Sequence, residues 1–586
     1  MKAAKGKIIA ITGSTIAVET EGDVLQNETG YVLYNGRRLL CEIIKIKGVI
    51  AYAQVYESTR GLYFGCEVIF TGKLLSIRLG PGLIGKVFDG LQNDLYKREG
   101  TFLQPGDHSP ALHDDITFEF FPLVEPNEEI EKGQALGFVK EIEFKHYIFA
   151  PDTIAKGTIV KYMHQQTKIQ QTEKKVAVLL EPNGNEVLVG MIKEWPVREP
   201  LKGYKEKQRP NEVLFTGVRA IDILYPIAVG GTAFIPGPFG CGKTVLQQSI
   251  SKNAKADIII FAACGERANE ITELLHSFTN LKDAETGKSL MERTIIVCNT
   301  SNMPVAAREA SVYTAITMAE YYRNMGLNVL LLADSTSRWA QALREISNRL
   351  EELPGPEAYP MDLPAIIAAF YARAGAVRLN NNKYGSITFI GTVSPAGGNL
   401  REPVTESTRK VARCFYSLSQ KRADTKRYPA IDPIESYSRY MAYEELEQFF
   451  NKHFYVGWNN DITYLINILV KGKEAAEQIN ILGDDAVPLE THIQFWQGEL
   501  VDFCLLQQDA FDEIDGRTNA DRQKEMVALV KQLLEMSYVF NGYETIAAFF
   551  KKRIFLFKQL NYSVFLSENY SNYKKDLLEL TPEKQV

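Results

Sequence analysis

The run GPFGCGKT, from Gly237 to Thr244, restricts the possible fold of this 586-residue chain more than any other feature. It meets the pattern G-x-x-x-x-G-K-[ST], a tight loop that needs a strand before it and a helix after it. The apolar run TAFIP precedes the loop and TVLQQSISKNA follows it. Further apolar runs, ADIIIFAACG, RTIIVCNT and NVLLLAD, alternate with helical segments. This alternation predicts a doubly wound α/β domain with a parallel sheet.

The segments on either side of that domain have different patterns. Short β-type runs fill the chain up to about Ile77, and Asn35-Gly36 is a strong signal for a hairpin turn. A second turn-rich β block follows, whereas amphipathic helical segments dominate from about Tyr440. The sequence therefore predicts a multidomain chain: an N-terminal β-barrel (1–77), a connector (78–114), an inserted β-rich bulge module (115–190), a central P-loop α/β domain (191–440) and a C-terminal α-helical domain (441–586).

The composition excludes several classes of function. A formal net charge of -6 gives no electrostatic reason to bind nucleic acid or an anionic membrane surface. No run approaches the roughly 18 consecutive apolar residues of a membrane-spanning helix. The seven scattered cysteines contain no C-x-x-C pair and indicate reduced thiols in the cytosol. We therefore expect a cytoplasmic protein whose link to any membrane runs through partners.

The P-loop itself supplies the candidate phosphate-binding groups. Its backbone N–H groups converge on phosphate oxygens, and the helix N-terminus adds partial positive charge. Lys243 would reach the β- and γ-phosphates, and the Thr244 hydroxyl would bind Mg²⁺. The candidate nucleotide-binding residues of the loop are Gly237, Pro238, Phe239, Gly240, Cys241, Gly242, Lys243, Thr244 and Val245.

Candidate reacting groups follow two of the other strands. Asp334 ends the run NVLLLAD, where a Walker-B acid for the magnesium side is expected. Its alternative role is a helix N-cap. Glu266 and Arg267 follow ADIIIFAAC; the carboxylate would orient or deprotonate the attacking water, and the guanidinium would bind the γ-phosphate. Their alternative is a mutual or helix-capping ion pair.

Cys241 lies inside the phosphate loop. A helix N-terminus can lower the pKa of a thiol and make it reactive, so we hypothesise thiol-sensitive activity. The equally plausible alternative is a small side chain that only fills space.

Over nearly its full length the chain resembles the catalytic A subunit of V-type and archaeal-type rotary ATPases. The resemblance rests on LGPGLIGKVFDGLQ, WPVRE, the P-loop region, CGERANE, NTSNMPVAAREAS, ADSTSRWAQALRE, GTVSPAGGN, EPVT and LQQDAFDE. It implies a RecA-like P-loop domain that binds ATP or ADP with Mg²⁺. Lys243 and Thr244 match the phosphate and magnesium ligands, Glu266 the catalytic carboxylate, Arg267 a γ-phosphate contact and Asp334 the Walker-B acid.

The resemblance also implies an adenine pocket and a set of partners. Tyr428 in KRYPAIDP and Phe511 in LQQDAFDE match the family's aromatic base contacts, although either could equally be a core residue. The implied partners are a B subunit that supplies an arginine finger, central and peripheral stalks and, indirectly, a membrane rotor. The complex would lie at the cytoplasmic face of the membrane. Ala268 and the loop PGPEAYP depart from the family pattern without removing a reacting group.

Other ring ATPases are the nearest alternatives: an F-type β subunit, a type III secretion ATPase or the Rho helicase. The inserted block and the helical C-terminus argue against each of them. A non-hydrolysing nucleotide-binding ring subunit is a further alternative, against which the intact P-loop and Glu266 argue. The sequence does not distinguish H⁺ from Na⁺ transport, or ATP hydrolysis from synthesis.

Overall fold

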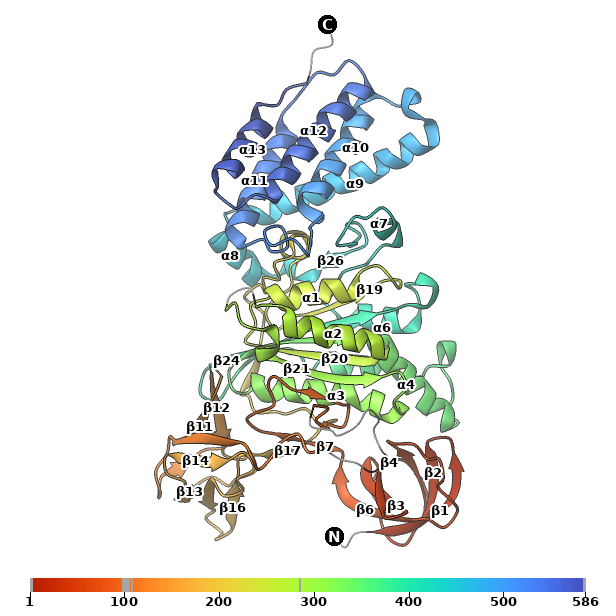
Figure 1. Cartoon of the computed structure of the whole chain (residues 1–586), viewed down its shortest axis with the longest axis vertical. Helices are drawn as coiled ribbons and strands as arrows, with labels where there is room; N and C mark the ends of the chain where they lie inside the picture. The colour runs from red at the N-terminus through yellow and green to blue at the C-terminus, as the bar shows by residue number, and fades with distance from the viewer. Residues whose placement is uncertain (1–3, 97–105, 107–108, 143, 284–285, 583–586) are drawn as a thin grey trace. The chain divides into compact units, whose positions relative to one another are not determined.

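The computed structural model describes residues 4–96, 106, 109–142, 144–283 and 286–582 (Figure 1). The predicted connector therefore has residues 97–105 and 107–108 outside the described part, as do the extreme ends of the first and last predicted domains. The chain divides into two compact units. The first comprises Met1–Gln208, Ala256–Lys282 and Lys288–Gly391, and the second Arg209–Lys255, Asp283–Gly287 and Thr392–Val586.

The first unit begins with a closed antiparallel barrel in the strand order β1-β2-β5-β4-β3-β6. The predicted turn at Asn35-Gly36 joins β3 and β4. Alternate side chains such as Ile8, Val32 and Ile43 point inward and are fully buried, as expected for half-buried strands. The strands are β1 (Lys5–Thr12), β2 (Thr15–Thr20), β3 (Glu28–Tyr34), β4 (Arg37–Lys47), β5 (Ile50–Val55) and β6 (Glu67–Leu74).

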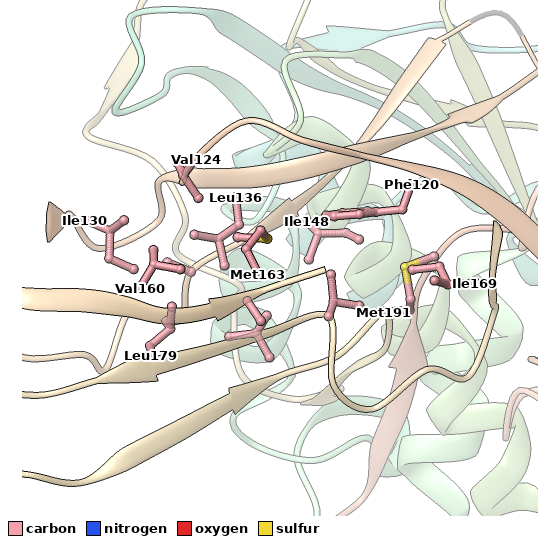
Figure 2. Close-up of a cluster of buried hydrophobic side chains, with 14 of the residues drawn as sticks. Phe120, Val124, Ile130, Leu136, Ile148, Val160, Met163, Ile169, Leu179 and Met191 are labelled. Atoms are coloured by element: carbon pink, nitrogen blue, oxygen red, sulfur yellow. The ribbon is translucent and has the colours of Figure 1, made fainter. Parts of the chain in front are cut away.

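The inserted module consists of two four-stranded sheets. One has the order β10-β13-β15-β16 and the other β12-β11-β9-β14. Figure 2 shows side chains of both sheets, among them Phe120, Leu136 and Val160, gathered into one apolar core. The strands are β9 (Thr117–Pro122), β10 (Glu129–Ile130), β11 (Ala135–Glu141), β12 (Phe144–Phe149), β13 (Thr158–Met163), β14 (Thr167–Gln170), β15 (Ala177–Leu180) and β16 (Glu186–Val189). Next to the module, β7 (Ser76–Leu79) pairs with β17 (Lys193–Pro196).

The α/β part of the first unit is a parallel sheet in the order β8-β21-β20-β22-β24. Antiparallel β23 and β18 extend it beside β24. The strands are β8 (Val87–Phe88), β18 (Glu206–Gln208), β20 (Ile258–Glu266), β21 (Thr294–Thr300), β22 (Asn328–Asp334), β23 (Gly375–Arg378) and β24 (Tyr384–Val393), whose last two residues belong to the second unit. The helices are α2 (Ala268–Asn280), α3 (Val305–Arg323), α4 (Thr336–Arg349) and α5 (Leu363–Tyr371), with short turns η2 (Leu290–Arg293) and η3 (Pro356–Ala358).

Arg198 joins the barrel to the α/β part within this unit. Its guanidinium donates to Glu42 of β4 at 3.0 Å and to Glu309 of α3 at 2.8 Å. Both carboxylates are buried, and bidentate guanidinium–carboxylate pairs are strong and directional. One arginine thus fixes the end of the barrel against the longest helix of the sheet.

The second unit holds the P-loop and the helical C-terminus. In it β19 (Thr232–Pro236) pairs in parallel with β25 (Cys414–Phe415), which pairs antiparallel with β26 (Tyr437–Ser438). The helices are α1 (Lys243–Asn253), α6 (Pro403–Val411), α7 (Gln420–Asp424), α8 (Glu444–His453), α9 (Trp458–Leu482), α10 (Leu489–Val501), α11 (Ala520–Glu535), α12 (Tyr543–Asn561) and α13 (Glu568–Glu579), with short segments η1 (Ala220–Leu224), η4 (Ala396–Gly398), η5 (Arg439–Ala442), η6 (Asp484–Ala486) and η7 (Asp502–Leu506). Barrel, β module, α/β sheet and helical C-terminus are all present, so the predicted fold class is confirmed.

Helices α9 and α10 approach each other at a pair of glycines. A Cβ added at Gly498 would lie 2.8 Å from the Cα of Gly472, and the reverse addition gives the same distance. Small residues at a helix crossing let the two backbones come close, and any side chain there must push them apart. The packing of the C-terminal helices therefore depends on this crossing.

We expect Gly498→Ala to lower the free energy of unfolding of the helical region by about 1–3 kcal/mol, because overpacking at a backbone contact cannot be relieved by a side-chain rotation. Gly542→Ala is the matched control, since nothing lies within 4 Å of a Cβ added there. Urea unfolding followed by helical circular dichroism checks both variants. Equal midpoints for the two would contradict the assigned role of the crossing.

Candidate active site

The phosphate loop has the geometry that its glycines predict. Gly240 and Gly242 have φ values of 84° and 82°, in the left-handed region that only glycine adopts easily. Gly242 is the N-cap of α1, and the Gly237 N–H donates to the Val393 carbonyl at 3.1 Å. The loop therefore turns tightly from β19 into α1, and the N-terminal N–H groups of α1 remain available for an anion.

The side chain of Lys243 curls back over this loop. Its Nζ donates to the Gly237 carbonyl at 2.6 Å and to Ser394 Oγ at 2.7 Å. An ammonium group is thereby held at the mouth of the loop, where it adds a full positive charge to the partial charge of the helix terminus. Thr244, the next residue, is exposed, and so are Phe239 and Val245.

A cavity of about 590 Å³ opens beside the loop. This volume falls within the range of roughly 300–1,000 Å³ that is usual for small-molecule sites. Its walls come from the loop at Gly240–Gly242, from Tyr428, from residues 507–511 and from the end of α12. All of these residues belong to the second unit, so the cavity is internal to that unit.

Tyr428 and Phe511, the two predicted base contacts, both line this cavity. Tyr428 is 43% exposed and Phe511 is 83% exposed, so neither is a core residue. A Cβ added at Gly242 would lie 3.7 Å from Cε1 of Tyr428, which shows how closely the ring approaches the loop. Exposed aromatic faces next to an anion-binding loop suit a flat ring that is attached to phosphates.

Glu266 and Asp334 lie together in the first unit. Asp334, the last residue of β22, pairs with Ala263 of β20, and β20 ends at Glu266. Both side chains therefore stand at the carboxyl edge of the parallel sheet, where ligands bind in such folds. Asp334 is buried and Glu266 is half-buried.

The surroundings of Glu266 favour its protonated form in the absence of cations. Burial, a hydrogen bond with Glu270 and the charge of Asp334 raise the pKa of Glu266 to about 8, whereas the Arg338 guanidinium lowers it. A carboxyl group with a pKa near neutrality matches the requirement for proton transfer at physiological pH. Arg267 follows on the surface as the N-cap of α2.

Several residues of these two groups were not predicted from the sequence. Glu270 lies one helical turn after Glu266 and Arg338 four residues after Asp334; these i,i+4 spacings could have indicated both. A close approach accompanies them, because a Cβ added at Gly265 would lie 2.9 Å from Cβ of Arg338. Asn561, which lines the cavity from α12, has no local signal at all.

The hypothesis of a reactive Cys241 thiol is wrong. Cys241 is 1% exposed, and its Sγ donates to Gln420 Oε1 at 3.3 Å. Burial raises the pKa of the Cys241 thiol above its ordinary value, and the smaller effect of Lys243 in the opposite direction does not offset it. Desolvation of the thiolate thus outweighs the positive end of the helix.

The residues of the chain match three family descriptions. The nucleotide-binding domain of the ATP synthase alpha/beta family matches residues 217–438, the barrel-sandwich domain of ATP synthase alpha/beta subunits matches 109–198, and the β-barrel domain of the same family matches 8–72.

Similar proteins extend over the whole chain. The V-type ATP synthase alpha chain of Treponema denticola is 44% identical and covers 100% of this chain and 97% of its own length. The V-type ATP synthase alpha chain 1 of Treponema pallidum is 44% identical and covers 98% and 96%. Among solved structures, the ATPase EscN of the enteropathogenic E. coli type III secretion system has a TM-score of 0.63 at 21% identity and covers 90% of this chain and 99% of its own. The last similarity is one of fold alone.

The buried thiol leads to a prediction about chemical labelling. At neutral pH we expect iodoacetamide to modify Cys241 in the folded chain at a rate on the order of tenfold or more below that in the urea-unfolded chain, because both the raised pKa and burial limit the thiolate. Mass spectrometry of the digested protein gives the rate for each cysteine. Rapid labelling of Cys241 in the folded chain would restore the reactive-thiol hypothesis.

Proposed function

Because the chain belongs to the family of V-type ATP synthase alpha chains, we propose that it carries out the phosphoryl chemistry of a rotary ATPase with Lys243, Glu266 and Asp334 as its central groups. The chain is an ATPase subunit with a nucleotide-binding domain of the alpha/beta family. The observation that carries the proposal is the loop geometry beside a cavity with exposed aromatic walls. Hydrolysis of ATP, or its synthesis, would be coupled to H⁺ or Na⁺ transport through other subunits.

The P-loop binds the phosphate chain. The N–H groups at the start of α1 point toward the loop, and the Lys243 ammonium lies above the Gly237 carbonyl. An incoming phosphate oxygen exchanges that carbonyl contact for a charge-assisted hydrogen bond, which is stronger. The ribose and base then extend along the cavity toward Tyr428 and Phe511.

Thr244 and Asp334 fit the requirements of Mg²⁺. They offer a hydroxyl and a carboxylate oxygen, and Mg²⁺ commonly takes only one or two protein ligands beside phosphate oxygens and water. When bound, the ion would neutralise charge on the phosphate oxygens. In the described part of the chain, no helix is long and apolar enough to cross a membrane, so the membrane link of the enzyme would come from its partners.

Glu266 acts on the attacking water. In its ionised form the carboxylate accepts a hydrogen bond from that water and takes its proton as the phosphoryl group transfers. Positive charge in the loaded site favours this ionised form and offsets the effect of Glu270 and Asp334. Arg267, exposed at the start of α2, would bind the γ-phosphate.

The catalytic carboxylate is tested by Glu266→Gln in the assembled enzyme. We expect turnover to fall by about 100- to 10,000-fold, because the amide cannot accept the proton, while nucleotide binding persists. Glu273→Gln, on the exposed face of α2, is the matched control and should keep parental activity. ATP hydrolysis at saturating MgATP, together with the Kd for nucleotide, provides the measurement. Near-parental turnover in Glu266→Gln would return Glu266 to an ion-pairing role.

The proposed site also requires a partner. A B subunit would supply an arginine finger in an alternating ring, with central and peripheral stalks joining that ring to a membrane rotor at the cytoplasmic face. Arginine fingers in other nucleotide hydrolases contribute roughly 1,000- to 100,000-fold in rate. The position of Arg267 beside Glu266 leaves that separate role to another chain.

We therefore expect the isolated chain to bind MgATP but hydrolyse it very slowly. Addition of the B subunit should raise the rate by on the order of 1,000-fold or more, and substitution of one interface arginine on B should remove the gain. Phosphate release by the purified chain, alone and after reconstitution, measures both effects. Full-rate hydrolysis by a verified monomer would refute the shared site.

A further inference from the structure

The end of α12 forms one wall of the nucleotide cavity. Lys558, Asn561 and Tyr562 line the cavity from this side, opposite the loop residues Gly240–Gly242. The wall is firmly held, because the Arg522 guanidinium donates to the carbonyls of Leu560 at 2.9 Å and Asn561 at 2.7 Å. A side chain on this turn therefore has a fixed origin relative to anything that enters the cavity.

The amide of Asn561 is oriented by one contact. Its Nδ2 donates to the Cys504 carbonyl at 3.3 Å, which makes Oδ1 the acceptor end. The residue is only 3% exposed, and within the described part of the chain Oδ1 is buried without a hydrogen-bond partner. Buried polar atoms nearly always have partners, so an orphaned acceptor in a cavity wall points to a ligand donor.

We propose that Asn561 distinguishes adenine from guanine by accepting a hydrogen bond from the 6-amino group of adenine. This inference rests on the proposed function, and it concerns specificity, not the reacting phosphates. Guanine carries a carbonyl oxygen at the same ring position. Two acceptors would then face each other, and a buried acceptor would stay unsatisfied. The aromatic walls at Tyr428 and Phe511 bind either purine, because stacking does not distinguish the exocyclic groups.

A neighbouring amide completes the pattern for adenine. Gln507 also lines the cavity, and its buried Nε2 donor has no hydrogen-bond partner among the described residues. Adenine presents a donor at its 6-amino group and an acceptor at N1, which match Asn561 Oδ1 and Gln507 Nε2. A glutamine amide that no hydrogen bond orients can turn over to suit guanine, whereas the Cys504 carbonyl prevents this at Asn561. Discrimination therefore depends on Asn561.

Binding of three diphosphates to the full-length chain tests the proposal: ADP, GDP and purine riboside diphosphate, which lacks the 6-amino group. Calorimetry gives each Kd. The parent should bind ADP about 2- to 10-fold more tightly than purine riboside diphosphate, the usual net effect of one hydrogen bond. It should bind GDP on the order of tenfold or more below ADP, because of the unsatisfied acceptor. This comparison needs no substitution and is independent of folding.

Two variants then assign the effect to the side chain. Asn561→Leu keeps the volume but removes the acceptor, so the ratio of the ADP and purine riboside diphosphate affinities should fall to about one. Asn561→Asp keeps an acceptor and should retain the preference for ADP, even where the affinity for all three ligands drops. Gln559→Leu, on the same helical turn but outside the cavity wall, is the matched control and should behave as the parent.

The outcomes separate this inference from the proposed function. If the parent binds none of the three diphosphates, the proposed function fails and the inference fails with it. If the parent binds ADP but does not distinguish it from purine riboside diphosphate, the inference alone is overturned. An Asn561→Leu variant that binds ADP with the parental ratio would likewise overturn it.

Discussion

The shape of the nucleotide cavity depends on a buried ion pair between Arg219 and Asp515. Gln508 lies between them: its Oε1 accepts from the Arg219 N–H at 2.8 Å, and its Nε2 donates to the Asp515 carbonyl at 2.8 Å. The backbone N–H of Gln508 also donates to the Tyr428 carbonyl at 2.8 Å. Removal of one partner from a buried pair typically costs about 3–5 kcal/mol, because the other charge is left uncompensated. The aromatic walls of the cavity therefore stand on an electrostatic foundation that no local sequence pattern reveals.

The elements that the sequence predicted well share a dependence on local chemistry. The P-loop needs its glycines for backbone geometry, and Asp334 and Glu266 follow continuous apolar runs that could only be buried strands. Asn561 lies 317 residues after Thr244 in the chain, so only the packing of α12 could bring it to the cavity wall. Cys241 failed for a related reason. The helix terminus is visible in the sequence, but the burial that outweighs it is not.

The carboxyl pair of Glu266 and Glu270 stores an electrostatic preference. Two acids that share a hydrogen bond cannot both ionise cheaply, and the nearby charge of Asp334 adds to the cost. Positive groups that enter the site relieve this repulsion and release the proton. The readiness of Glu266 to act is thus linked to whether cationic groups are in place, and an empty site is held in a protonated, inactive form.

The N-terminal barrel is closed by the pairing of β6 with β1. A closed barrel has no row of unpaired backbone N–H and C=O groups, so it offers no template on which another chain could add a strand. A neighbouring subunit must recognise this domain through side chains and loops, such as the exposed rings of Tyr63 and Phe64. Such contacts are readily altered by substitution without any change in the barrel, so the domain can change its neighbours while its architecture persists.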